Sequence, residues 1–516
     1  MITVSEGWKE AHHQLLLPET FIEISYAVTE PGLQQDASSS ANMEESYSQA
    51  QSLTSTLTVD REKYGTLEWN FWGLDGSFGY FDGQPEHPGY VTSSLSEGDA
   101  SFTALPTMQI SFSERHTILI PGVTITWSET FDEWARRFRV LAYSGNSLIA
   151  QKLVEDNTSP VSQVWMDLQG YNKLVIEVLK WSHPQHRARV ARVYLGIRTI
   201  YTKNDLLGYT HRQSVDLLSA ALPKNEIVVR LRNEDSRWNP ENPSGAERYL
   251  MERQELNVKY GMTVNGVTEW IEGGHFWLSG WSTPANGIEA SFTARDVVEF
   301  MNETYTGPTS GTLYTIATAA FQQAQLPVAD SGMARYYVDN SLRNYSTTIE
   351  GEDTIAEVLQ KVAHMACCVI YQDRNGVMRI EPRGTALSDY TIRREVSYSH
   401  PEFEISKPLK AVEVRYGEEG RYLLPVASSG EVQTVDNDFV KTEADAQRVA
   451  QAAADVLRGR KTISGEFRAD PRLDALDIVT VESKFATNPV VISEIEYSTT
   501  GGGFHGKFTG KLVQDG

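Results

Sequence analysis

The last part of the chain has the most regular pattern of apolar and polar positions. Three runs rich in Val, Ile, Phe and Tyr lie between Arg472 and Lys511, and apolar residues tend to alternate with polar ones in each run. Turn residues separate the runs at Thr487–Pro489 and at Thr499–Gly503. Such alternation is typical of half-buried strands. The pattern predicts an antiparallel three-stranded meander at the end of the chain.

Residues from about 98 to 200 repeat this alternation more densely. Polar turns separate seven short strand-like runs, which are Gln109–Phe112, Val123–Trp127, Phe138–Ala142, Leu148–Val154, Val164–Leu168, Lys173–Leu179 and Ala191–Gly196. Many short strands at this spacing predict a β-sandwich. Before them, we expect strands at Thr20–Ala27 and Ser52–Val59, with a polar loop at Gln34–Ser48.

The pattern changes to a helical period after residue 304. One predicted helix places its apolar side chains on a single face, namely Leu313, Ile316, Ala317, Ala320, Phe321 and Ala324. A second opens with the capping-box pair Thr354 and Glu357 and continues as an apolar stripe. Asn375-Gly376 then indicates the tip of a hairpin. A third helix is expected over Thr442–Leu457, ended by Gly459.

These patterns predict a mainly β fold with an α+β middle domain. A chain of 516 residues is too long for one ordinary core. The patterns divide the chain into strand-rich residues 1–97, the β-sandwich of residues 98–200 and strand-rich residues 201–303. Residues 304–400 form the helix and hairpin domain, and residues 401–516 contain strands and the third helix.

The charge of the chain limits its partners. The formal net charge is −22 and the pI is near 5.0, whereas a protein that grips nucleic acid usually carries a basic patch. The acidic surplus favours either a passage through which DNA slides or a surface that only keeps the protein soluble. No signal peptide and no long apolar segment is recognisable, which predicts synthesis in a cytoplasm without export by the usual route.

Few side chains in the sequence suggest a disulfide, a metal site or a catalytic site. The only cysteines, Cys367 and Cys368, are adjacent within an apolar run, which predicts small buried hydrophobes without a disulfide framework or zinc site. His183 and His186 suggest a metal pair, but Pro184 lies between them and no carboxylate follows at ligand spacing. We therefore expect a solvated loop there.

Three other groups of side chains have ordinary structural interpretations. Asp436, Asn437 and Asp438 suggest a calcium loop, but the Gly and the closing Glu of such a loop are absent. His12-His13 is expected on the surface, and the aromatic group at Trp69–Trp72 is expected in a core or an interface. Motifs of metalloproteases, serine hydrolases and phosphate-binding loops are also absent. We predict no catalytic, cofactor or metal site and no enzymatic activity.

The segment Asp470–Val481 reads D-P-R-L-D-A-L-D-I-V-T-V, and a strand containing I-E-Y and a glycine-rich turn follow it. This order resembles the closing barrel of bacteriophage tail hub proteins. The run E-I-V-V-R-L-R-N, with the proline-rich loop and strands after it, is similar to the first barrel of that family, and the helix and hairpin are similar to its middle domain. The resemblance covers residues 203–516 and, more loosely, 1–95. It implies that residues 1–97 and 201–303 form a first tube-like β-barrel with the β-sandwich of residues 98–200 inserted in it, and that residues 401–516 form a second barrel. The sandwich, with D-E-W-A-R-R-F-R-V-L-A-Y, resembles a discoidin-like jelly roll.

The resemblance implies a structural virion protein at the phage tail tip, synthesised in the host cytoplasm. Three subunits with two barrels each would form a pseudo-sixfold ring that closes the hexameric tail tube and opens for DNA ejection. The implied partners are two further copies of the chain, the distal tail protein ring, the tape measure protein and a tail fibre or receptor-binding protein. DNA would pass without specific binding, and a cell-surface glycan is a further candidate partner.

Two alternatives stay open at this point. One is a tail-associated cell-wall hydrolase, although we expect no lytic domain after the last strand because the chain ends soon after it. The other is a carbohydrate-binding adhesin in which the sandwich is the working part.

Overall fold

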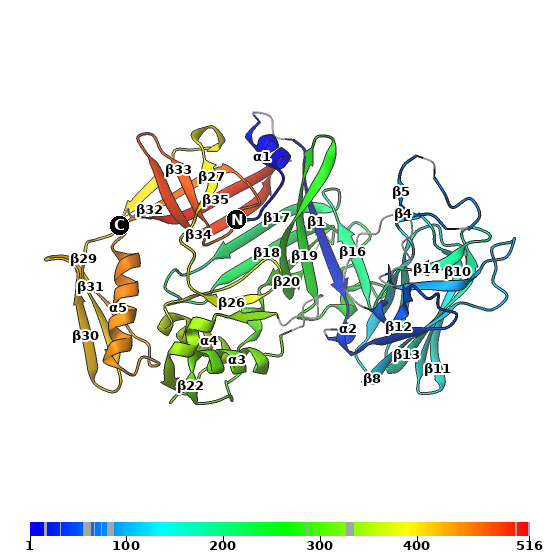
Figure 1. The fold of residues 1–516 in the computed structure, drawn as a ribbon, viewed down its shortest axis with the longest axis horizontal. Coiled ribbons are helices and arrows are strands. Elements are labelled where there is room, and N and C mark those ends of the chain that lie inside the picture. Colours follow the sequence, from blue (N-terminus) through cyan, green and yellow to red (C-terminus); the bar gives the residue numbers. More distant parts are fainter. Residues whose placement is uncertain are drawn as a thin grey trace.

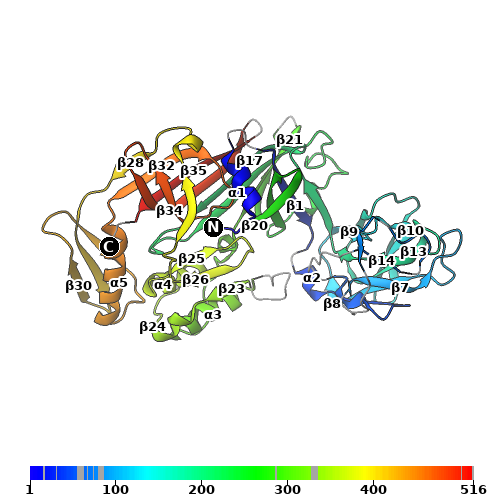
Figure 2. The same ribbon diagram turned by 45° about the horizontal axis from the view of Figure 1, so that its top comes forward.

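The structure is a computed structural model that describes residues 1–14, 18–30, 32–54, 63–66, 68–73, 75–79, 87–284, 287–326, 335–500 and 503–513. Strands dominate the fold, as predicted, and helices are few. The molecule is elongated, with the sandwich at one end and a small helix-backed sheet at the other (Figure 1). Figure 2 shows the same arrangement after a turn of the view. Among the described residues, no helix is both long and apolar enough to span a membrane.

The largest sheet has thirteen strands and draws on both halves of the chain. Seven strands form what we call the first barrel unit: β1 (Thr20–Val28), β16 (Ile197–Tyr201), β17 (Leu206–Ser214), β18 (Lys224–Arg232), β19 (Glu255–Val264), β20 (Val267–Ser282) and β21 (Glu289–Arg295). Six form the second barrel unit: β27 (Leu387–Ile392), β28 (Glu402–Ile405), β32 (Lys461–Arg468), β33 (Ile478–Glu482), β34 (Thr487–Thr500) and β35 (Gly503–Leu512). Strand β17 pairs antiparallel with β34 and so joins the two units edge to edge.

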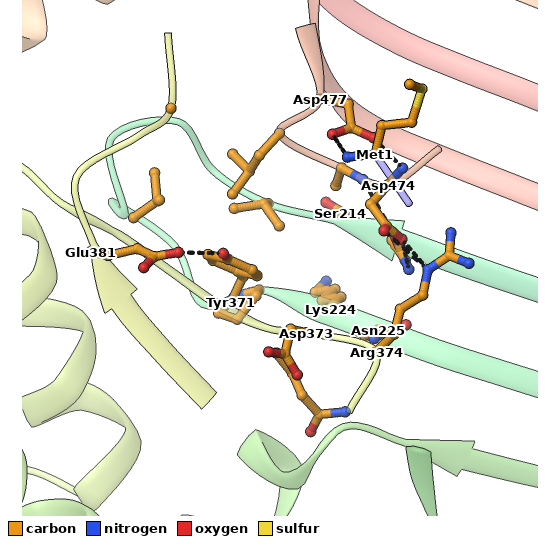
Figure 3. Close-up of a pocket in the computed structure, with 18 of the residues that line it drawn as sticks. Met1, Ser214, Lys224, Asn225, Tyr371, Asp373, Arg374, Glu381, Asp474 and Asp477 are labelled. Carbon is orange, nitrogen blue, oxygen red and sulfur yellow. Dashed lines mark hydrogen bonds and ion pairs between the residues drawn. The ribbon is translucent and has the colours of Figure 1, made fainter. Parts of the chain in front are cut away.

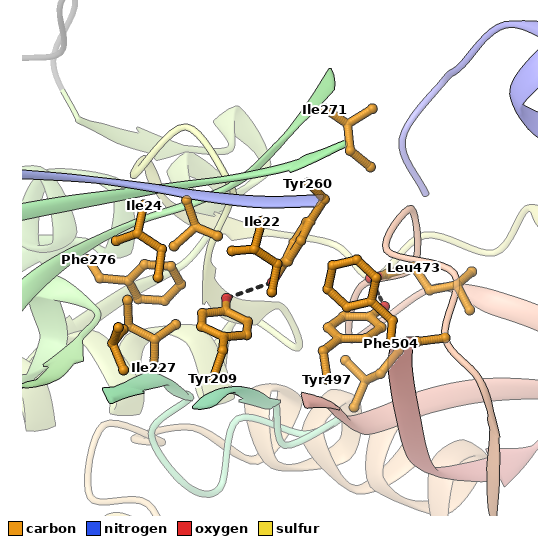
Figure 4. Close-up of a cluster of buried hydrophobic side chains, with 14 of the residues drawn as sticks. Ile22, Ile24, Tyr209, Ile227, Tyr260, Ile271, Phe276, Leu473, Tyr497 and Phe504 are labelled. Atoms are coloured by element: carbon orange, nitrogen blue, oxygen red, sulfur yellow. Dashed lines mark hydrogen bonds between the residues drawn. The ribbon is translucent and has the colours of Figure 1, made fainter. Parts of the chain in front are cut away.

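One hydrophobic core runs through both barrel units (Figure 4). Tyr209 and Tyr260 of the first unit share a hydrogen bond of 2.7 Å between their hydroxyl groups. The ring of Tyr260 also packs edge-on against Phe504 of the second unit, with 5.5 Å between ring centroids. Aromatic pairs at this spacing add to the free energy gained by burial. The two units therefore share a core as well as a sheet.

The terminal meander is confirmed, with one difference in its first turn. Strands β33, β34 and β35 are consecutive antiparallel neighbours. The first turn lies at Ser483–Ala486, where the amide of Ser483 donates to the carbonyl of Ala486, and not at Thr487–Pro489. Pro489 lies inside β34, opposite Thr480. Its position near the start of the strand is one that proline tolerates.

The sandwich is confirmed in all seven of its predicted strands. They are β8 (Thr107–His116), β9 (Ile120–Thr126), β10 (Ala135–Ser144), β11 (Ser147–Val154), β12 (Val161–Leu168), β13 (Tyr171–Trp181) and β15 (Arg192–Tyr194). They divide between a five-stranded sheet, ordered β11-β10-β13-β8-β2, and a three-stranded sheet, ordered β12-β9-β15. Trp127, Phe138 and Trp181 are buried between the sheets, in a core distinct from that of the barrel units.

The sandwich extends further toward the N-terminus than the expected boundary at residue 97. Strand β2 (Ser38–Ala41) pairs with β8, and β7 (Tyr90–Leu95) pairs with β14 (Arg187–Val190). Leu33, in the short helix α2 (Leu33–Asp36), and Leu53 are buried in the sandwich core.

Both ends of this larger insertion lie together, because Val28 of β1 is paired with Ile197 of β16. The polar composition of Gln34–Ser48 concealed the strand β2, whose register is set by its partner β8 and not by an apolar pattern of its own. The strand predicted at Ser52–Val59 is wrong for residues 52–54, the part of this range that the structure describes. Ser52 ends the 3-10 helix η1 (Ala50–Ser52), and residues 55–59 lie outside the described residues.

Short strands complete this N-terminal region. They are β3 (Ser48–Gln49), β4 (Lys63–Tyr64), β5 (Phe78–Gly79) and β6 (His87–Pro88). A helix α1 (Glu6–His13) precedes β1, and the side chain of Ser5 caps it by accepting from the amide of Trp8.

The middle domain contains both predicted helices and the predicted hairpin. Helix α3 (Leu313–Gln323) begins after Thr312, and α4 (Ile355–Met365) has the capping box in which Thr354 and Glu357 bond reciprocally. Strands β25 (Val369–Gln372) and β26 (Met378–Glu381) form the hairpin, and Gly376 in its loop has φ +72°, which favours glycine. The remaining short strands are β22 (Ser310–Thr312), β23 (Tyr336–Val338) and β24 (Ser346–Thr348).

Residues 409–457 form a separate layer and not part of the second barrel unit. The predicted third helix is α5 (Glu443–Leu457), and it packs on a sheet ordered β30-β29-β31. The strands of this sheet are β29 (Leu409–Tyr416), β30 (Gly420–Pro425) and β31 (Glu431–Val435). Val449 of α5 and Val412 of β29 share a core with Val362 of α4. The expected second barrel is therefore interrupted by a unit that packs on the middle domain.

Candidate functional site

A cavity of about 370 Å³ lies where the two barrel units meet the middle hairpin (Figure 3). The buried guanidinium of Arg374, from the hairpin loop, donates to both carboxylate oxygens of Asp474 at 2.9 and 3.0 Å. It also donates to the carbonyl of Glu272 in the first unit at 2.8 Å and to that of Leu473 at 2.9 Å. One side chain thus connects three parts of the molecule through charge-assisted hydrogen bonds.

The other polar groups at this junction also bond to one another. The amide side chain of Gln213 donates to Asp474 at 3.0 Å and accepts from the amide of Ala475 at 3.1 Å. The N-terminal ammonium of Met1 pairs with Asp477. Asp474 and Asp477 are both paired with cations, and the two other carboxylates that line the cavity, Asp373 and Glu381, lie 2.7 and 3.7 Å from Arg379. The arrangement is suited to holding the parts at a fixed angle.

Helix α1 attaches the start of the chain to the second barrel unit. His12 is 2% exposed, and its ring nitrogen Nε2 lies 3.1 Å from the carbonyl oxygen of Ala469. The guanidinium of Arg468 donates to the carbonyl of His12 at 2.6 Å. The surface prediction for the dipeptide is therefore wrong for His12, whereas His13 is exposed. A bare dipeptide carries no signal of this contact, since its partners lie more than 450 residues away in the sequence.

A second cavity, of about 340 Å³, lies in the sandwich beside the aromatic group at Trp69–Trp72. Phe71 is buried, with its ring centroid 4.6 Å from that of Phe131 and 4.5 Å from the guanidinium carbon of Arg189. Trp69 and Trp72 are instead 61% and 50% exposed. The core interpretation holds for Phe71, and Trp69 presents an accessible ring that lines the cavity.

The same cavity brings together His183, His186 and Glu133. His186 is only 5% exposed, which contradicts the expected solvated loop, and its Nδ1 lies 2.5 Å from Oε1 of Glu133. Burial alone would lower the pKa of His186, but the hydrogen bond and charge of Glu133 outweigh it and raise that pKa. His183 is 49% exposed, and its ring stacks on that of His186 with 5.3 Å between centroids.

Sequence reasoning missed Glu133 because it lies about fifty residues before the histidines. The loop between β9 and β10 carries it, and the loop between β13 and β14 carries both histidines. The fold of the sandwich brings these loops to one end, and local spacing carries no sign of that.

The other candidates form no common site. Asp436 pairs with Arg415 at 3.3 Å, and Asp438 pairs with Lys361 at 3.0 Å. The side chain of the buried Asn437 bonds to backbone groups. These side chains are thus engaged separately and do not converge as in a calcium loop. Cys367 and Cys368 are free, and burial raises the pKa of Cys368 to about 12, so its thiol stays protonated at neutral pH.

Comparisons with known proteins give matches among solved structures alone, since no protein-family model and no curated protein matches the chain. The 43 kDa tail protein of prophage MuSo2 from Shewanella oneidensis is 13% identical, with coverage of 60% of this chain and 94% of that one and a TM-score of 0.43. The prophage tail protein gp18 from Listeria monocytogenes is 12% identical, with coverage of 61% and 91% and a TM-score of 0.40.

Two further solved structures are similar to parts of the chain. A type VI secretion component of E. coli, described as similar to phage tail proteins, is 11% identical and has a TM-score of 0.36. A family 32 carbohydrate-binding module from C. perfringens, solved with galactose, is 13% identical, with coverage of 34% of this chain and 99% of that one and a TM-score of 0.21. The solved structures that are similar to this chain thus include prophage tail proteins and a secretion component described as similar to phage tail proteins.

Proposed function

We propose that this chain is a structural subunit of a phage tail tip, a trimeric hub that closes the distal end of the tail tube and opens for DNA ejection. The observation that carries the proposal is the pair of barrel units joined edge to edge by β17 and β34 within one chain. Three such chains around a threefold axis present six β units, which suits contact with a sixfold tube. Closed rings of this kind arise from one repeated heterologous contact.

A ring of this kind needs subunits with a fixed internal angle. The shared core and the Arg374–Asp474 pair supply one, because both barrel units and the middle hairpin meet at that guanidinium. A flexible joint would let the two units of each chain depart from the ring. The junction cavity is therefore assigned a structural role.

The ends of the thirteen-stranded sheet supply candidate contact surfaces. Strand β28 ends the path of the sheet, and its apolar side chains Phe403 and Ile405 are 45% and 60% exposed. At the opposite end, Ile200 of β16 is 52% exposed. Open strand edges bearing apolar side chains readily pair with another chain. Different surfaces at the two ends fit a head-to-tail ring.

The remaining partners follow from the same role. The hub would contact the distal tail protein ring, the end of the tape measure protein and a tail fibre or receptor-binding protein. The net charge of −22 favours DNA passage without specific binding, since like charges repel within a narrow lumen. The sandwich lies at the end of the molecule away from the second barrel unit, where it is accessible to further partners (Figures 1 and 2).

A carbohydrate-binding adhesin is the second candidate function. The sandwich cavity favours it, because the exposed ring of Trp69 lies beside polar groups of Asn70 and His183. An apolar face with a few convergent polar groups is typical of small-molecule sites. A glycan array probed with the purified chain and with the variant Trp69→Ala tests this function separately. Binding that the variant loses supports it, and an array without signal removes it.

Electron microscopy of purified tails tests the hub function. A gold-labelled antibody raised against the purified chain should mark the distal tip of the tail tube, with an antibody against the tube protein as the control that marks its length. Label along the tube, at the head or on no part of the particle would overturn the proposal.

A further inference from the structure

The side chains of Glu133, His183 and His186 form a cluster that the hub role does not use. Among the described residues, they are the one group of three His, Cys, Asp or Glu side chains whose ligand atoms lie within 4.8 Å of one another. We propose that this cluster binds a divalent transition-metal ion, with zinc the best match. The proposal is independent of the hub function.

The hydrogen bonds of His186 are the first argument. Nε2 of its ring contacts the carbonyl oxygen of Trp69, which only accepts, so Nε2 carries the proton. Nδ1 lies 2.5 Å from Oε1 of Glu133, which is a hydrogen-bond contact, so a proton lies between them in the metal-free chain. A bound metal ion would replace this proton, and the two ligand atoms would then separate to about 3.3 Å. A metal-binding histidine typically donates its other N–H to a backbone carbonyl in this way.

The surroundings of Glu133 are the second argument. Its Oε2 accepts from the indole N–H of Trp181 at 2.9 Å and lies 3.7 Å from the guanidinium of Arg189. These contacts orient the carboxylate and leave Oε1 directed at the histidines. Outer contacts of this kind fix the geometry of a metal ligand.

The fixed charges around the cluster leave room for a cation. Arg189 pairs with Glu68, and Arg187 lies 3.3 Å from Glu45, so two guanidiniums face three carboxylates when Glu133 is included. Lys63, which also lines the cavity, is exposed at its rim, where water and salt screen its charge.

His183 completes the ligand set with a small movement. Its Nδ1 lies 4.0 Å from Oε1 of Glu133, whereas ligands around a tetrahedral zinc ion are separated by about 3.3 Å. The side chain is 49% exposed, and its Nδ1 lies 3.0 Å from the hydroxyl of Ser182, so binding exchanges that hydrogen bond for the metal ion. Both loops also hold a non-glycine residue with positive φ directly before a ligand, namely Asp132 at +53° and Gln185 at +61°. Backbone strain of this kind tends to occur at functional sites.

The ligand types identify the class of metal. Two imidazoles with one carboxylate suit zinc and its neighbours, whereas calcium and magnesium prefer sets made of oxygen alone. Three protein ligands leave a fourth position of a tetrahedron open. All three line the cavity, so that position is accessible to water or to an oxygen donor of a bound molecule.

Calorimetric titration of the tag-free full chain with zinc chloride, after treatment with a chelator, tests the proposal. We expect one zinc ion per chain and a loss of affinity of at least about tenfold in His183→Gln. His183 is half-exposed, so this variant should fold. His400→Gln is the matched control, because His400 is an exposed histidine on a different part of the surface and its loss should not change the affinity.

Cobalt provides a second readout that does not depend on heat of binding. Co²⁺ bound to wild type should show the visible absorption bands of a four-coordinate ion, and Glu133→Gln should lose them. A wild-type chain that binds zinc no more tightly than His183→Gln overturns the proposal. So does a chain that takes up neither metal while His186 titrates by NMR as a charged imidazolium held by Glu133.

Discussion

The two barrel units and the sandwich are both built of short strands, but they join the rest of the molecule differently. The barrel units share one sheet and one core, and Arg374 of the middle hairpin bonds to both of them. The sandwich has its own core, and the paired ends of β1 and β16 enclose its insertion point. Some of its side-chain contacts with the first unit are partly exposed. One is the ion pair between Asp167 and Arg248, which are 3.0 Å apart. The two barrel units, which we call the barrel pair, therefore behave as one body, whereas the sandwich is an attached module.

The largest expected effect comes from removing the module. Replacing residues 30–196 with a short Gly/Ser turn joins Val28 to Ile197 as a hairpin, because these residues are already opposite each other. The product should be soluble, with the thermal transition of the barrel pair retained. Replacing only residues 101–195 should cause aggregation, since it exposes Leu33 and Leu53, which are buried in the sandwich core.

Size-exclusion chromatography and circular dichroism of the two deletions check this comparison. If the shorter deletion is soluble and the longer one aggregates, the module begins near residue 97 and its contacts with β2 are incidental.

The next effect concerns the junction of the barrel pair. Arg374→Ala removes the cation that pairs with Asp474, whose side chain is 26% exposed, and it also removes the donor to the carbonyls of Glu272 and Leu473. The cost in folding free energy should therefore exceed that of an exposed pair and stay below the cost for a fully buried one, which is about 3–5 kcal/mol. Arg212→Ala is the matched control, because Arg212 is 56% exposed and its pair with Glu494 links the same two strands, β17 and β34. An exposed pair contributes about 0–1 kcal/mol.

Urea denaturation of both variants measures the difference. Equal shifts in the urea midpoint for Arg374→Ala and Arg212→Ala would show that the Arg374–Asp474 pair stabilises the chain no more than the exposed pair does. The shared core alone would then hold the barrel pair together.

A smaller effect is expected at the boundary between the first barrel unit and the middle domain. Burial raises the pKa of Asp296 to about 8, and within the described part of the chain its Oδ2 is buried without a hydrogen bond. The folded state therefore holds a proton that the unfolded state releases near pH 4. Stability from this group is fully present below about pH 4 and is lost as the pH rises to about 8.

Asp296→Asn should flatten this part of the pH profile and stabilise the chain most at pH 8. The exposed Asp99 of the sandwich offers the control Asp99→Asn. Thermal unfolding at pH 5 and pH 8 distinguishes the two variants, and an unchanged slope in Asp296→Asn would show that other groups set the pH dependence.

The sequence predicts local structure better than distant contacts in this chain. Alternation and capping residues act within a few positions, which is why α4 with its Thr354 cap and the seven sandwich strands were predictable. Strand β2 was hidden because its four residues, S-S-S-A, have no apolar pattern and depend on β8 for their register. The burial of His12 and the meeting of Glu133 with His186 depend on chain segments far apart in the sequence.

The mass of the ring isolated from assembled tails tests the hub proposal most directly. One chain weighs 57.7 kDa, so three copies give about 173 kDa in native mass spectrometry. We predict this mass for the wild-type chain, and its loss in a variant with Phe403→Lys and Ile405→Lys on the open edge strand β28. The same change at Leu148 and Leu153, exposed on β11 of the sandwich, should leave it intact. A single copy, or six copies, in the assembled tail would contradict a threefold hub made of two barrel units per chain.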